Sequence, residues 1–338
     1  GYGMLSGGRE YMSQFDYVIV GAGSAGCVLA NRLSANPDIR VCLLEAGGSN
    51  RSPLLHVPAG WAATFGNSKF DWSFQTEPEP ELNNRQVLWP RGKVLGGSSA
   101  INGMIYIRGV PLDFAAWEQA GAKGWSWEEV LPYYKKAEKQ QVHRDDMHGT
   151  DGPLHVQDVR DKRPMDNEFI RAMNQAGIPS NPDFNGIDQA GCGYYQFTQS
   201  NGRRWSTASA YLNPIRSRTN LNIVTHAHAQ RVFFEGKRAR GVEIRRHGKN
   251  ETVRGDHIIL SGGAIASPQL LEVSGVGDGE RLRHLGIDVV HHAPDVGEHL
   301  QDHLLCKVVY GTEPESSINR EVQGLNLVPA ALKWFFLR

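Results

Sequence analysis

The stretch "FDYVIVGAGSAGCVLANRL" (residues 15–33) decides the fold of this chain. Its first six residues are β-formers with an apolar end, which is typical of a buried parallel strand. The turn "GAGSAG" (residues 21–26) follows without a spacer, and the apolar residues after it recur at helical spacing. A second apolar run, "IRVCLLE" (residues 39–45), then ends in an acid. This order predicts strand, tight turn, helix and strand, the unit that binds dinucleotides.

The three glycines of this turn have separate physical tasks. Gly21 permits the tight turn, Gly23 lets the backbone approach a pyrophosphate, and Gly26 lets the helix pack closely on the strand. The helix N-terminus offers free N–H groups and the positive end of its dipole to the phosphates. Glu45, nineteen positions after Gly26, is placed to accept hydrogen bonds from ribose hydroxyls. An acid there disfavours a 2′-phosphate, so the motif predicts NAD or FAD without choosing between them.

A second glycine-rich stretch, "RGKVLGGSSAINGM" (residues 91–104), lies about seventy residues downstream of the first. Its Gly-Gly pair (residues 96–97) lacks Cβ atoms, so the backbone can lie along the edge of a wide, flat ring such as isoalloxazine. Serine hydroxyls and the Asn102 amide supply hydrogen-bonding groups, and Arg91 and Lys93 supply positive charge for a pyrophosphate. The alternative interpretation is a surface loop with solvated cations. A nicotinamide enzyme has little use for a second such loop, so the pair favours a flavin.

A third strand–turn–helix pattern is present in "HIILSGGAIASPQLLEVSG" (residues 257–275). The apolar strand is followed by the Gly262–Gly263 turn, and Ser267 with Pro268 predicts a helix N-cap and first helical residue. The helix is expected to stop at Gly275. Such a turn can lie against a ligand at the carboxyl edge of a sheet. A purely structural strand–helix unit would look the same, so this pattern depends on the other two for its meaning.

Two of these stretches resemble signatures of the glucose–methanol–choline (GMC) oxidoreductase family. Residues 91–109 resemble its first signature, and residues 263–277 match its second closely. The resemblance runs from about Phe15 to the C-terminus, and its nearest branches are the choline dehydrogenases and the bacterial aliphatic alcohol dehydrogenases. Other family-like stretches are "FDWSFQTEPEPELNNRQ", "HGTDGPLHV", "RWSTASAYL" and "VGEHLQDHL".

The resemblance implies an α/β fold, α+β overall, with a Rossmann-like FAD-binding domain and a discontinuous substrate-binding lobe. The FAD-binding domain is expected at residues 14–156 and 221–303. Part of the substrate-binding domain is expected at residues 157–220 and 304–338, with its remainder missing. Residues 1–13 are interpreted as a lead-in or tag. An amphipathic helix closed by Gly177 and a strand within the aromatic stretch that follows it are expected in the second domain.

The motifs and the resemblance together predict FAD as the cofactor. In some family members a histidine of the Gly-Gly loop holds FAD covalently, but Ile101 stands at that position here, so FAD is expected to be non-covalent. By resemblance, Trp72 packs near the adenine–ribose half and the backbone of Val232 meets the adenine. The predicted cofactor-binding residues are Gly21, Gly23, Ser24, Gly26, Glu45, Ala46, Trp72, Arg91, Val94, Gly97, Ser98, Asn102, Gly103, Met104, Ile105, Val232 and Gly263.

The activity implied by the resemblance is oxidation of a primary alcohol to its aldehyde, with hydride transfer to flavin N5. The alcohol is choline or an aliphatic or aromatic alcohol, and the electron acceptor is left open between a quinone and oxygen. The catalytic histidine is expected beyond Arg338, so no catalytic residue is assigned in this chain. The alternatives are a non-redox family member, either a hydroxynitrile lyase or a light-driven fatty-acid decarboxylase, or an inactive flavin-binding fragment.

Composition excludes several other classes. Lys+Arg and Asp+Glu are both 36, so no charge excess points to nucleic acid. Four widely spaced cysteines without CxxC spacing predict buried thiols in a reducing compartment, and neither they nor the histidines predict a metal site. The sequence contains no apolar run of ~18 residues, so it predicts no membrane span. A cytoplasmic location is expected; association with the surface of the inner membrane, and a second chain carrying the C-terminal region, are left open.

Overall fold

The structure, a computed structural model, describes residues 14–303, 305–306 and 308–311. These form two compact units. The first combines residues 14–102 with 206–303, and the second contains residues 103–205 with the described residues after 303. The changes at 102/103 and 205/206 differ from the predicted boundaries at 156/157 and 220/221. The reason is that residues 105–106, 138–140 and 154–158 are joined with residues 196–197 in a sheet of the second unit.

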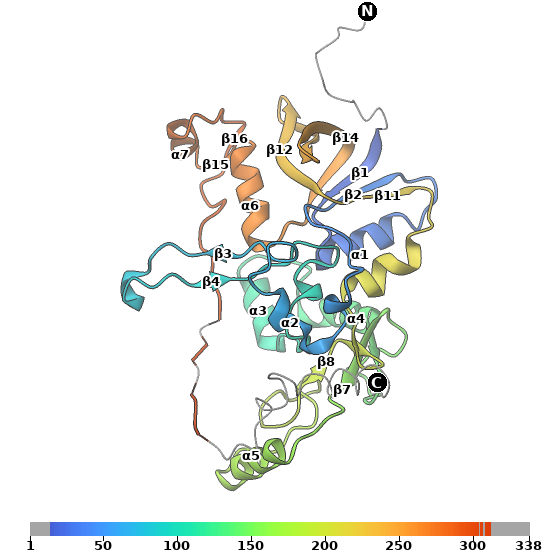
Figure 1. Ribbon diagram of the computed structural model, residues 1–338, viewed down its shortest axis with the longest axis vertical. Coiled ribbons are helices and arrows are strands. Elements are labelled where there is room, and N and C mark those ends of the chain that lie inside the picture. The colour runs from blue at the N-terminus through green and yellow to red at the C-terminus, as the bar shows by residue number, and fades with distance from the viewer. Residues whose placement is uncertain (1–13, 304, 307, 312–338) are drawn as a thin grey trace, which may run out of the picture. The chain divides into compact units, whose positions relative to one another are not determined.

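The first unit is built on a six-stranded sheet in the order β11-β2-β1-β14-β13-β12 (Figure 1). The first four strands in this order pair in parallel, and the last three are joined by antiparallel pairing. The long strand β14 serves both parts: its first half pairs with β13 and its second half with β1. The strands are β1 (Phe15–Val20), β2 (Val41–Leu44), β11 (Leu221–Val224), β12 (Ala227–Glu235), β13 (Arg238–Arg246) and β14 (Lys249–Leu260).

Burial explains why the central strands read as continuous apolar runs. All four residues of β2 are buried, and Val18 and Ile19 of β1 are fully buried. Parallel strands covered on both faces carry apolar side chains at every position. Helix α1 (Ser24–Leu33) packs against β1 and β2, and helix α6 (Gly263–Val273) packs against β12. The predicted strand, turn, helix and strand order is therefore confirmed.

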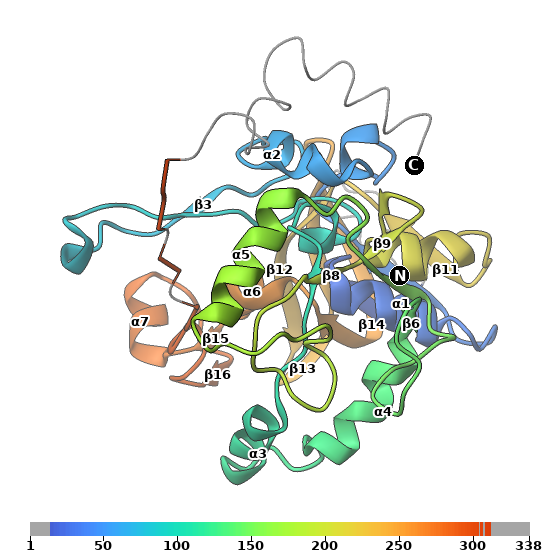
Figure 2. The ribbon, with the colours of Figure 1, turned by 90° about the horizontal axis from the view of Figure 1, so that it is seen from below.

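The second unit contains a four-stranded sheet in the order β5-β8-β7-β6. Its described residues also form the helices α3, α4 and α5, which are labelled in Figure 2. The predicted amphipathic helix is α5, and Gly177 follows it at φ +88. The aromatic stretch expected as a strand contributes the two residues of β8 and Gln199, which begins the two-residue strand β9 (Gln199–Ser200). These elements are β5 (Ile105–Tyr106), β6 (Glu138–Gln140), β7 (Leu154–Asp158), β8 (Gln196–Phe197), α3 (Pro111–Gln119), α4 (Trp127–Ala137) and α5 (Pro164–Gln175).

Shorter elements complete both units. Two-stranded sheets pair β3 with β4, β9 with β10, and β15 with β16. Short helical turns occur between residues 53 and 100, before and within the second glycine-rich stretch. Two more occur at residues 208–215, just after the chain returns to the first unit. Their bounds are β3 (Phe74–Gln75), β4 (Leu88–Trp89), β9 (Gln199–Ser200), β10 (Arg203–Arg204), β15 (Val276–Gly277), β16 (His291–His292), α2 (Trp61–Thr64), α7 (Gly279–His284), η1 (Pro53–Leu55), η2 (Pro58–Gly60), η3 (Pro80–Leu82), η4 (Gly97–Ala100), η5 (Ala208–Leu212) and η6 (Asn213–Ile215).

The cysteines follow the expected pattern in three of four cases. Cys27, Cys42 and Cys192 are buried, whereas Cys306 is exposed. Burial raises the pKa of the Cys27 and Cys42 thiols to about 12. A thiol that stays protonated is a poor nucleophile, so Cys27 and Cys42 act as packing residues.

Within the described part of the chain, no helix is both long and apolar enough to cross a membrane. The predicted lead-in at residues 1–13 lies outside the described residues. The apolar stretch at residues 327–338 also lies outside the described residues.

Candidate cofactor site

Three predicted ligand-binding segments meet at one edge of the sheet in the first unit. The first glycine turn follows β1, the third follows β14, and Glu45 follows β2. Strand β1 pairs in parallel with both neighbours, in a register that puts Val20 beside Leu44 and Leu260. Because the carboxyl ends of parallel strands lie at the same edge, the two turns and the acid are brought together there.

The first turn is built from contacts that only glycine allows. Gly21 has φ +100, and a Cβ added to it would lie 2.5 Å from the carbonyl oxygen of Ser261. A Cβ on Gly26 would lie 1.9 Å from the carbonyl oxygen of Gly21, so α1 and β1 touch through bare backbone. At Gly23 the nearest protein atom to an added Cβ is 3.9 Å away. The first two glycines are thus required by packing, while Gly23 leaves open space beside the turn.

Glu45 holds this turn as well as facing the pocket. Its carboxylate accepts the Ala22 N–H at Oε2 and the Gly47 N–H at Oε1, each at 2.9 Å. The residue is only 5% exposed. Burial raises its pKa to about 7, against the opposing effect of the two backbone hydrogen bonds and of the Lys93 charge. Glu45 therefore fixes the first turn before any ligand is bound.

The second glycine-rich stretch packs directly against the first. Gly96 donates its N–H to the Ala22 carbonyl at 2.8 Å. A Cβ added to Gly97 would lie 2.6 Å from the Cα of Gly23, and Gly97 has φ +52. A side chain at Gly97 would therefore separate the two turns. The second loop is a second wall of the same site, and the expectation of a solvated surface loop is not met.

The third turn differs from its prediction in where its helix begins. Helix α6 starts at Gly263 with Gly262 as N-cap, whereas Ser267 was predicted as the N-cap and Pro268 as the first helical residue. The Ser267 hydroxyl lies inside the first part of the helix and accepts the Gly262 N–H at 2.9 Å. Pro268 has no N–H to give to the Ala264 carbonyl, four residues earlier. The serine and proline therefore do not cap a helix but shape the turn that precedes it.

A pocket of about 860 Å³ lies where these turns converge. All of its lining residues belong to the first unit. Its size is in the range of protein sites for small molecules and cofactors. Ten of the predicted cofactor residues line it: Gly21, Gly23, Ser24, Glu45, Ala46, Trp72, Arg91, Gly97, Ser98 and Gly263.

The other predicted residues have different positions. Gly26 is in the helix–strand contact, and Val94 is fully buried in an apolar cluster. Val232 is a core residue whose N–H is already donated to the Ser274 hydroxyl at 2.9 Å. Asn102 is exposed at the end of the first unit, and the three residues after it, Gly103, Met104 and Ile105, belong to the second unit.

Several lining residues were not predicted. Residues 227–230 line the pocket where Val232 was expected, because the Ala227 N–H bonds to the Glu45 carbonyl and brings the start of β12 to this edge. The sequence offered one signal, the apolar run at residues 221–224 just before this segment, but not the pairing of that run with β2. Gly262 of the predicted third turn also lines the pocket, whereas Phe74, Ser261 and Gln269 are further lining residues that were not predicted.

Trp72 stands in a small aromatic cluster on the pocket wall. Its ring is stacked on Phe74 at 5.9 Å, lies 5.3 Å from the His228 ring, and has the Lys93 ammonium 4.6 Å from its centre. Burial, assisted by Lys93, lowers the pKa of His228. The imidazole of His228 is therefore neutral at pH 7 and offers one donor and one acceptor on this wall.

Comparison with known proteins identifies one family over residues 15–305, in agreement with the resemblance of the sequence motifs. Residues 15–305 match the model of the GMC oxidoreductase family. An alcohol dehydrogenase [acceptor] from Pseudomonas putida is 50% identical over 294 residues, covering 86% of this chain and 53% of that protein. The mitochondrial choline dehydrogenase of Mus musculus is 43% identical over 331 residues, covering 96% of this chain and 56% of that protein.

Solved structures agree with the fold. Pyridoxine 4-oxidase from Mesorbium loti has a TM-score of 0.80 and 37% identity, covering 83% of this chain and 56% of that one. An FAD-dependent oxidoreductase from Chaetomium thermophilum has a TM-score of 0.78 and 28% identity, covering 83% and 51%. The chain thus spans about half the length of the relatives it matches. By its motifs, its fold and these matches, the chain belongs to the GMC oxidoreductase family.

Proposed function

We propose that this chain is the FAD-binding part of an oxidoreductase that acts on an alcohol. One observation carries the proposal: three glycine turns, from three separate segments, converge on a single pocket within one compact unit. A nicotinamide site would need only the first of these turns. Family membership, and the name of the Chaetomium thermophilum relative, support FAD rather than NAD.

The pocket residues fit the phosphate and ribose parts of FAD. Gly23 and Ser24 at the start of α1 present backbone N–H groups and the positive end of the helix dipole to a pyrophosphate. Arg91 also lines the pocket and adds a positive charge. Each carboxylate oxygen of Glu45 accepts one backbone hydrogen bond and retains capacity for a ribose hydroxyl.

The pocket also fits a flat ring system. An added Cβ at Gly263 would meet nothing within 4 Å, so the space beside the third turn is open. Gly97 and Ser98 of the second glycine-rich loop also line the pocket, and neither has a bulky side chain. Ile101, at the position where some relatives carry a linking histidine, is 1% exposed in an apolar cluster. An aliphatic side chain cannot form that bond, so we propose that FAD is held without a covalent link.

The proposed reaction is oxidation of a primary alcohol to an aldehyde. When bound, FAD supplies the redox chemistry by accepting the carbinol hydride at flavin N5. This chain's residues bind and orient the cofactor and shape its surroundings. By family resemblance, the histidine base is expected beyond Arg338, in the half of the relatives that this chain does not span. The activity is therefore proposed for the whole protein.

The substrate and the electron acceptor are proposed by class. The names of the relatives support choline or another primary alcohol. A quinone and oxygen both stay open as acceptors, and a quinone would require contact with a membrane surface. Anaerobic mixing of the whole protein with each alcohol should bleach the oxidised flavin for the true substrate. Full turnover of an added substrate without bleaching would instead indicate a non-redox member of the family.

The visible absorption spectrum of the purified chain tests cofactor binding first. We expect flavin bands in the native protein, either as purified or after incubation with FAD. We also expect these bands in the supernatant after acid precipitation. A precipitate that stays yellow would overturn the non-covalent assignment. The assignment of the pocket would be overturned by a chain whose far-UV circular dichroism is that of a folded α/β protein but which, once separated from free FAD after incubation, has no flavin bands.

A further inference from the structure

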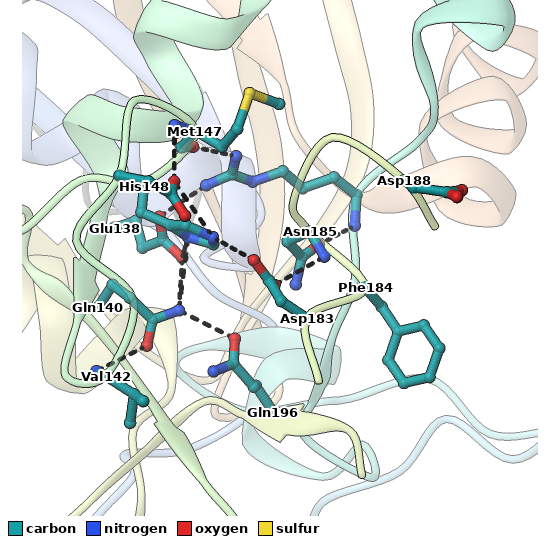
Figure 3. A network of polar contacts seen from close by, with 12 residues as sticks. Glu138, Gln140, Val142, Met147, His148, Asp183, Phe184, Asn185, Asp188 and Gln196 are labelled. Carbon is teal, nitrogen blue, oxygen red and sulfur yellow. Dashed lines mark hydrogen bonds and ion pairs between the residues drawn. The ribbon is translucent and has the colours of Figure 1, made fainter. Parts of the chain in front are cut away.

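The second unit contains a buried chain of alternating charges that the proposed function does not use (Figure 3). The Arg108 guanidinium contacts the Glu138 carboxylate at 2.6 Å. Glu138 contacts Nδ1 of His148 at 3.2 Å, and Nε2 of His148 contacts the Asp183 carboxylate at 2.9 Å. The side chains of Glu138 and His148 are completely buried, and that of Asp183 is 12% exposed. The four groups come from β6 and three separate loops.

The hydrogen bonds at His148 fix its charge. A neutral imidazole has one N–H, but here each ring nitrogen faces a carboxylate, which only accepts hydrogen bonds when ionised. Both nitrogens must therefore carry protons. Burial by itself would lower the pKa of His148, but the bonds to Asp183 and Glu138 outweigh it and raise that pKa to about 9. Burial opposes ionisation of Asp183, but the His148 contact and the Asn185 N–H lower its pKa.

Other groups around His148 are consistent with a cation there. Asp145 lies at 4.0 Å from Nε2. The Gln140 Nε2 lies 3.5 Å from Nδ1 but donates its two N–H groups to Glu138 and Gln196, so it does not need Nδ1 as an acceptor. The His143 ring is stacked on His148 at 5.5 Å. Asp145, His148 and Asp183 are close enough together to hold a metal ion. However, the direct 2.9 Å contact between Nε2 and Asp183 is a hydrogen bond, and it occupies the nitrogen that a metal would need.

The charged chain is tied to the strand that continues the second glycine loop. The second oxygen of Asp183 accepts the Asn185 N–H at 3.0 Å. The Asn185 side chain then donates to the Tyr106 carbonyl at 3.0 Å and accepts the Arg108 N–H at 2.8 Å. It thus bonds to the backbone as a neighbouring strand would. Asn185 is 4% exposed, so these bonds are shielded from water.

We propose that His148 is a positioning residue, which is held as a cation between Glu138 and Asp183 and fixes the backbone of residues 105–108. This segment directly follows Asn102, Gly103 and Met104, for which flavin contacts were predicted. The consequence for the cofactor rests on the proposed function; the charge and the fixed backbone do not. The result is a clamp, defined as Arg108, Glu138, His148, Asp183 and Asn185, that opens when His148 loses its proton.

Side-chain ¹⁵N NMR of the histidine-labelled chain tests the charge directly and needs no FAD. We expect one imidazole with protons on both nitrogens at pH 7.5, titrating near pH 9, whose signal is absent from His148→Gln. A His148 signal with an unprotonated nitrogen at pH 7.5 would overturn the proposal. If that nitrogen responds to added Zn²⁺, the cluster is a metal site instead.

Urea unfolding as a function of pH tests the energetic link. Because the folded pKa lies above the ordinary value of 6.5, the stabilisation is fully present below pH 6.5 and is lost as pH rises through about 9. We expect the folded-to-unfolded ratio of wild type over His148→Gln to fall on the order of a hundredfold between pH 6 and pH 10. His143→Gln, in the stacked neighbouring ring, is the matched control and should show no such fall. An equal pH dependence in both variants would overturn the proposal.

Hydrogen exchange at pH 7 tests the positioning. Amides of residues 105–108 should exchange at least tenfold faster in His148→Gln than in wild type or His143→Gln. Unchanged exchange there would overturn the positioning role, even if His148 is a cation. Titration with FAD is read separately: a clamp confirmed by NMR and exchange in a chain that does not bind FAD would leave the clamp intact and reject the proposed function. If His148→Gln does not fold, the wild-type NMR titration decides the charge, and Asn185→Ala decides the positioning by the same exchange measurement.

Discussion

The pocket of the first unit and the clamp of the second are stabilised in opposite ways. In the pocket, backbone touches backbone: the first and second glycine turns meet through Gly97 and Gly23. In the clamp, charged side chains from distant positions satisfy one another. The carboxyl groups of Glu45 in the pocket and Asp183 in the clamp show the contrast. The pKa of Glu45 is raised because burial dominates, whereas that of Asp183 is lowered because a cation and an N–H overcome burial.

This difference decides which substitutions each region tolerates. A backbone contact fails when any Cβ is added, whatever its chemistry, because the atoms overlap. A buried charge network fails when one charge is removed, even if the shape is kept, because the partner is left without compensation. The predictions below test the two kinds of failure, from the largest expected effect to the smallest.

Arg108→Met should produce the largest loss of stability. The substitution keeps an aliphatic side chain but leaves Glu138 with His148 as its only cation in the clamp, at a site with no access to water. Breaking a buried pair in this way costs about 3–5 kcal/mol. Urea unfolding at pH 7 measures it. Arg231→Met is the control, because the pair of Arg231 with Glu243 is exposed and is worth only about 0–1 kcal/mol. Equal losses in the two variants would show that the clamp is no more than a surface ion pair.

Gly26→Ala should lower the free energy of unfolding by about 1–3 kcal/mol or more. Its Cβ would lie 1.9 Å from the carbonyl oxygen of Gly21, and that carbonyl belongs to the backbone and cannot swing aside as a flexible side chain could. The measurement is again urea unfolding, followed by FAD titration. Gly23→Ala is the matched variant in the same turn: its Cβ meets no protein atom within 3.9 Å, so stability should change by less than about 0.5 kcal/mol while FAD affinity falls at least tenfold. A stable Gly23→Ala that binds FAD like wild type would contradict the placement of the pyrophosphate at this turn.

The same contrast explains how much could be predicted from the sequence. The fold and the glycine turns of the pocket were predictable because glycine-rich turns stand between strands and a helix that have their own periodicity. Trp72 was predicted by the family resemblance and not from a local pattern. The start of α6 was misplaced, because Ser267 and Pro268 look like a cap although the serine serves the turn before the helix. Val232 was assigned by family resemblance to a backbone contact with the adenine. A backbone contact does not depend on the side chain, so the residue type at this position gave no signal.

The clamp was not predictable from local patterns. Its four charged members are separated along the chain by 30, 10 and 35 residues, and charged side chains in a sequence normally indicate solvated surface. One signal was present in "HGTDGPLHV", which contains His148. A Cβ on Gly149 would lie 1.8 Å from the Lys135 carbonyl, and one on Gly152 would lie 2.3 Å from Ala137 backbone atoms. The sequence shows only the two glycines beside the histidine; that packing requires them, and that His148 is buried, is known from the structure.

Glu45→Gln should change the pH dependence of stability in the first unit. The folded pKa of Glu45 is raised from 4.5 to about 7, so its contribution is fully present below pH 4.5 and is lost as pH rises through 7. We expect the stability of wild type relative to Glu45→Gln to fall by more than ~1 kcal/mol between pH 4.5 and pH 7.5. Urea unfolding across this range measures it. Glu77→Gln, at an exposed position, should show no slope, and a flat profile for Glu45→Gln would mean that its carboxyl is ionised at little cost.

Ser267→Ala should have the smallest effect, and it tests whether the pocket depends on side chains at all. The Ser267 hydroxyl accepts the Gly262 N–H and so holds the third turn against the pocket. Losing one neutral hydrogen bond costs about 0.5–1.5 kcal/mol, measured by urea unfolding. FAD affinity should fall by a similar free energy if the loosened turn lines the bound ring. Ser267→Thr keeps the hydroxyl and should restore both. If stability falls but FAD affinity does not, the third turn supports the fold without touching the cofactor, and the flavin is held by the first two turns alone.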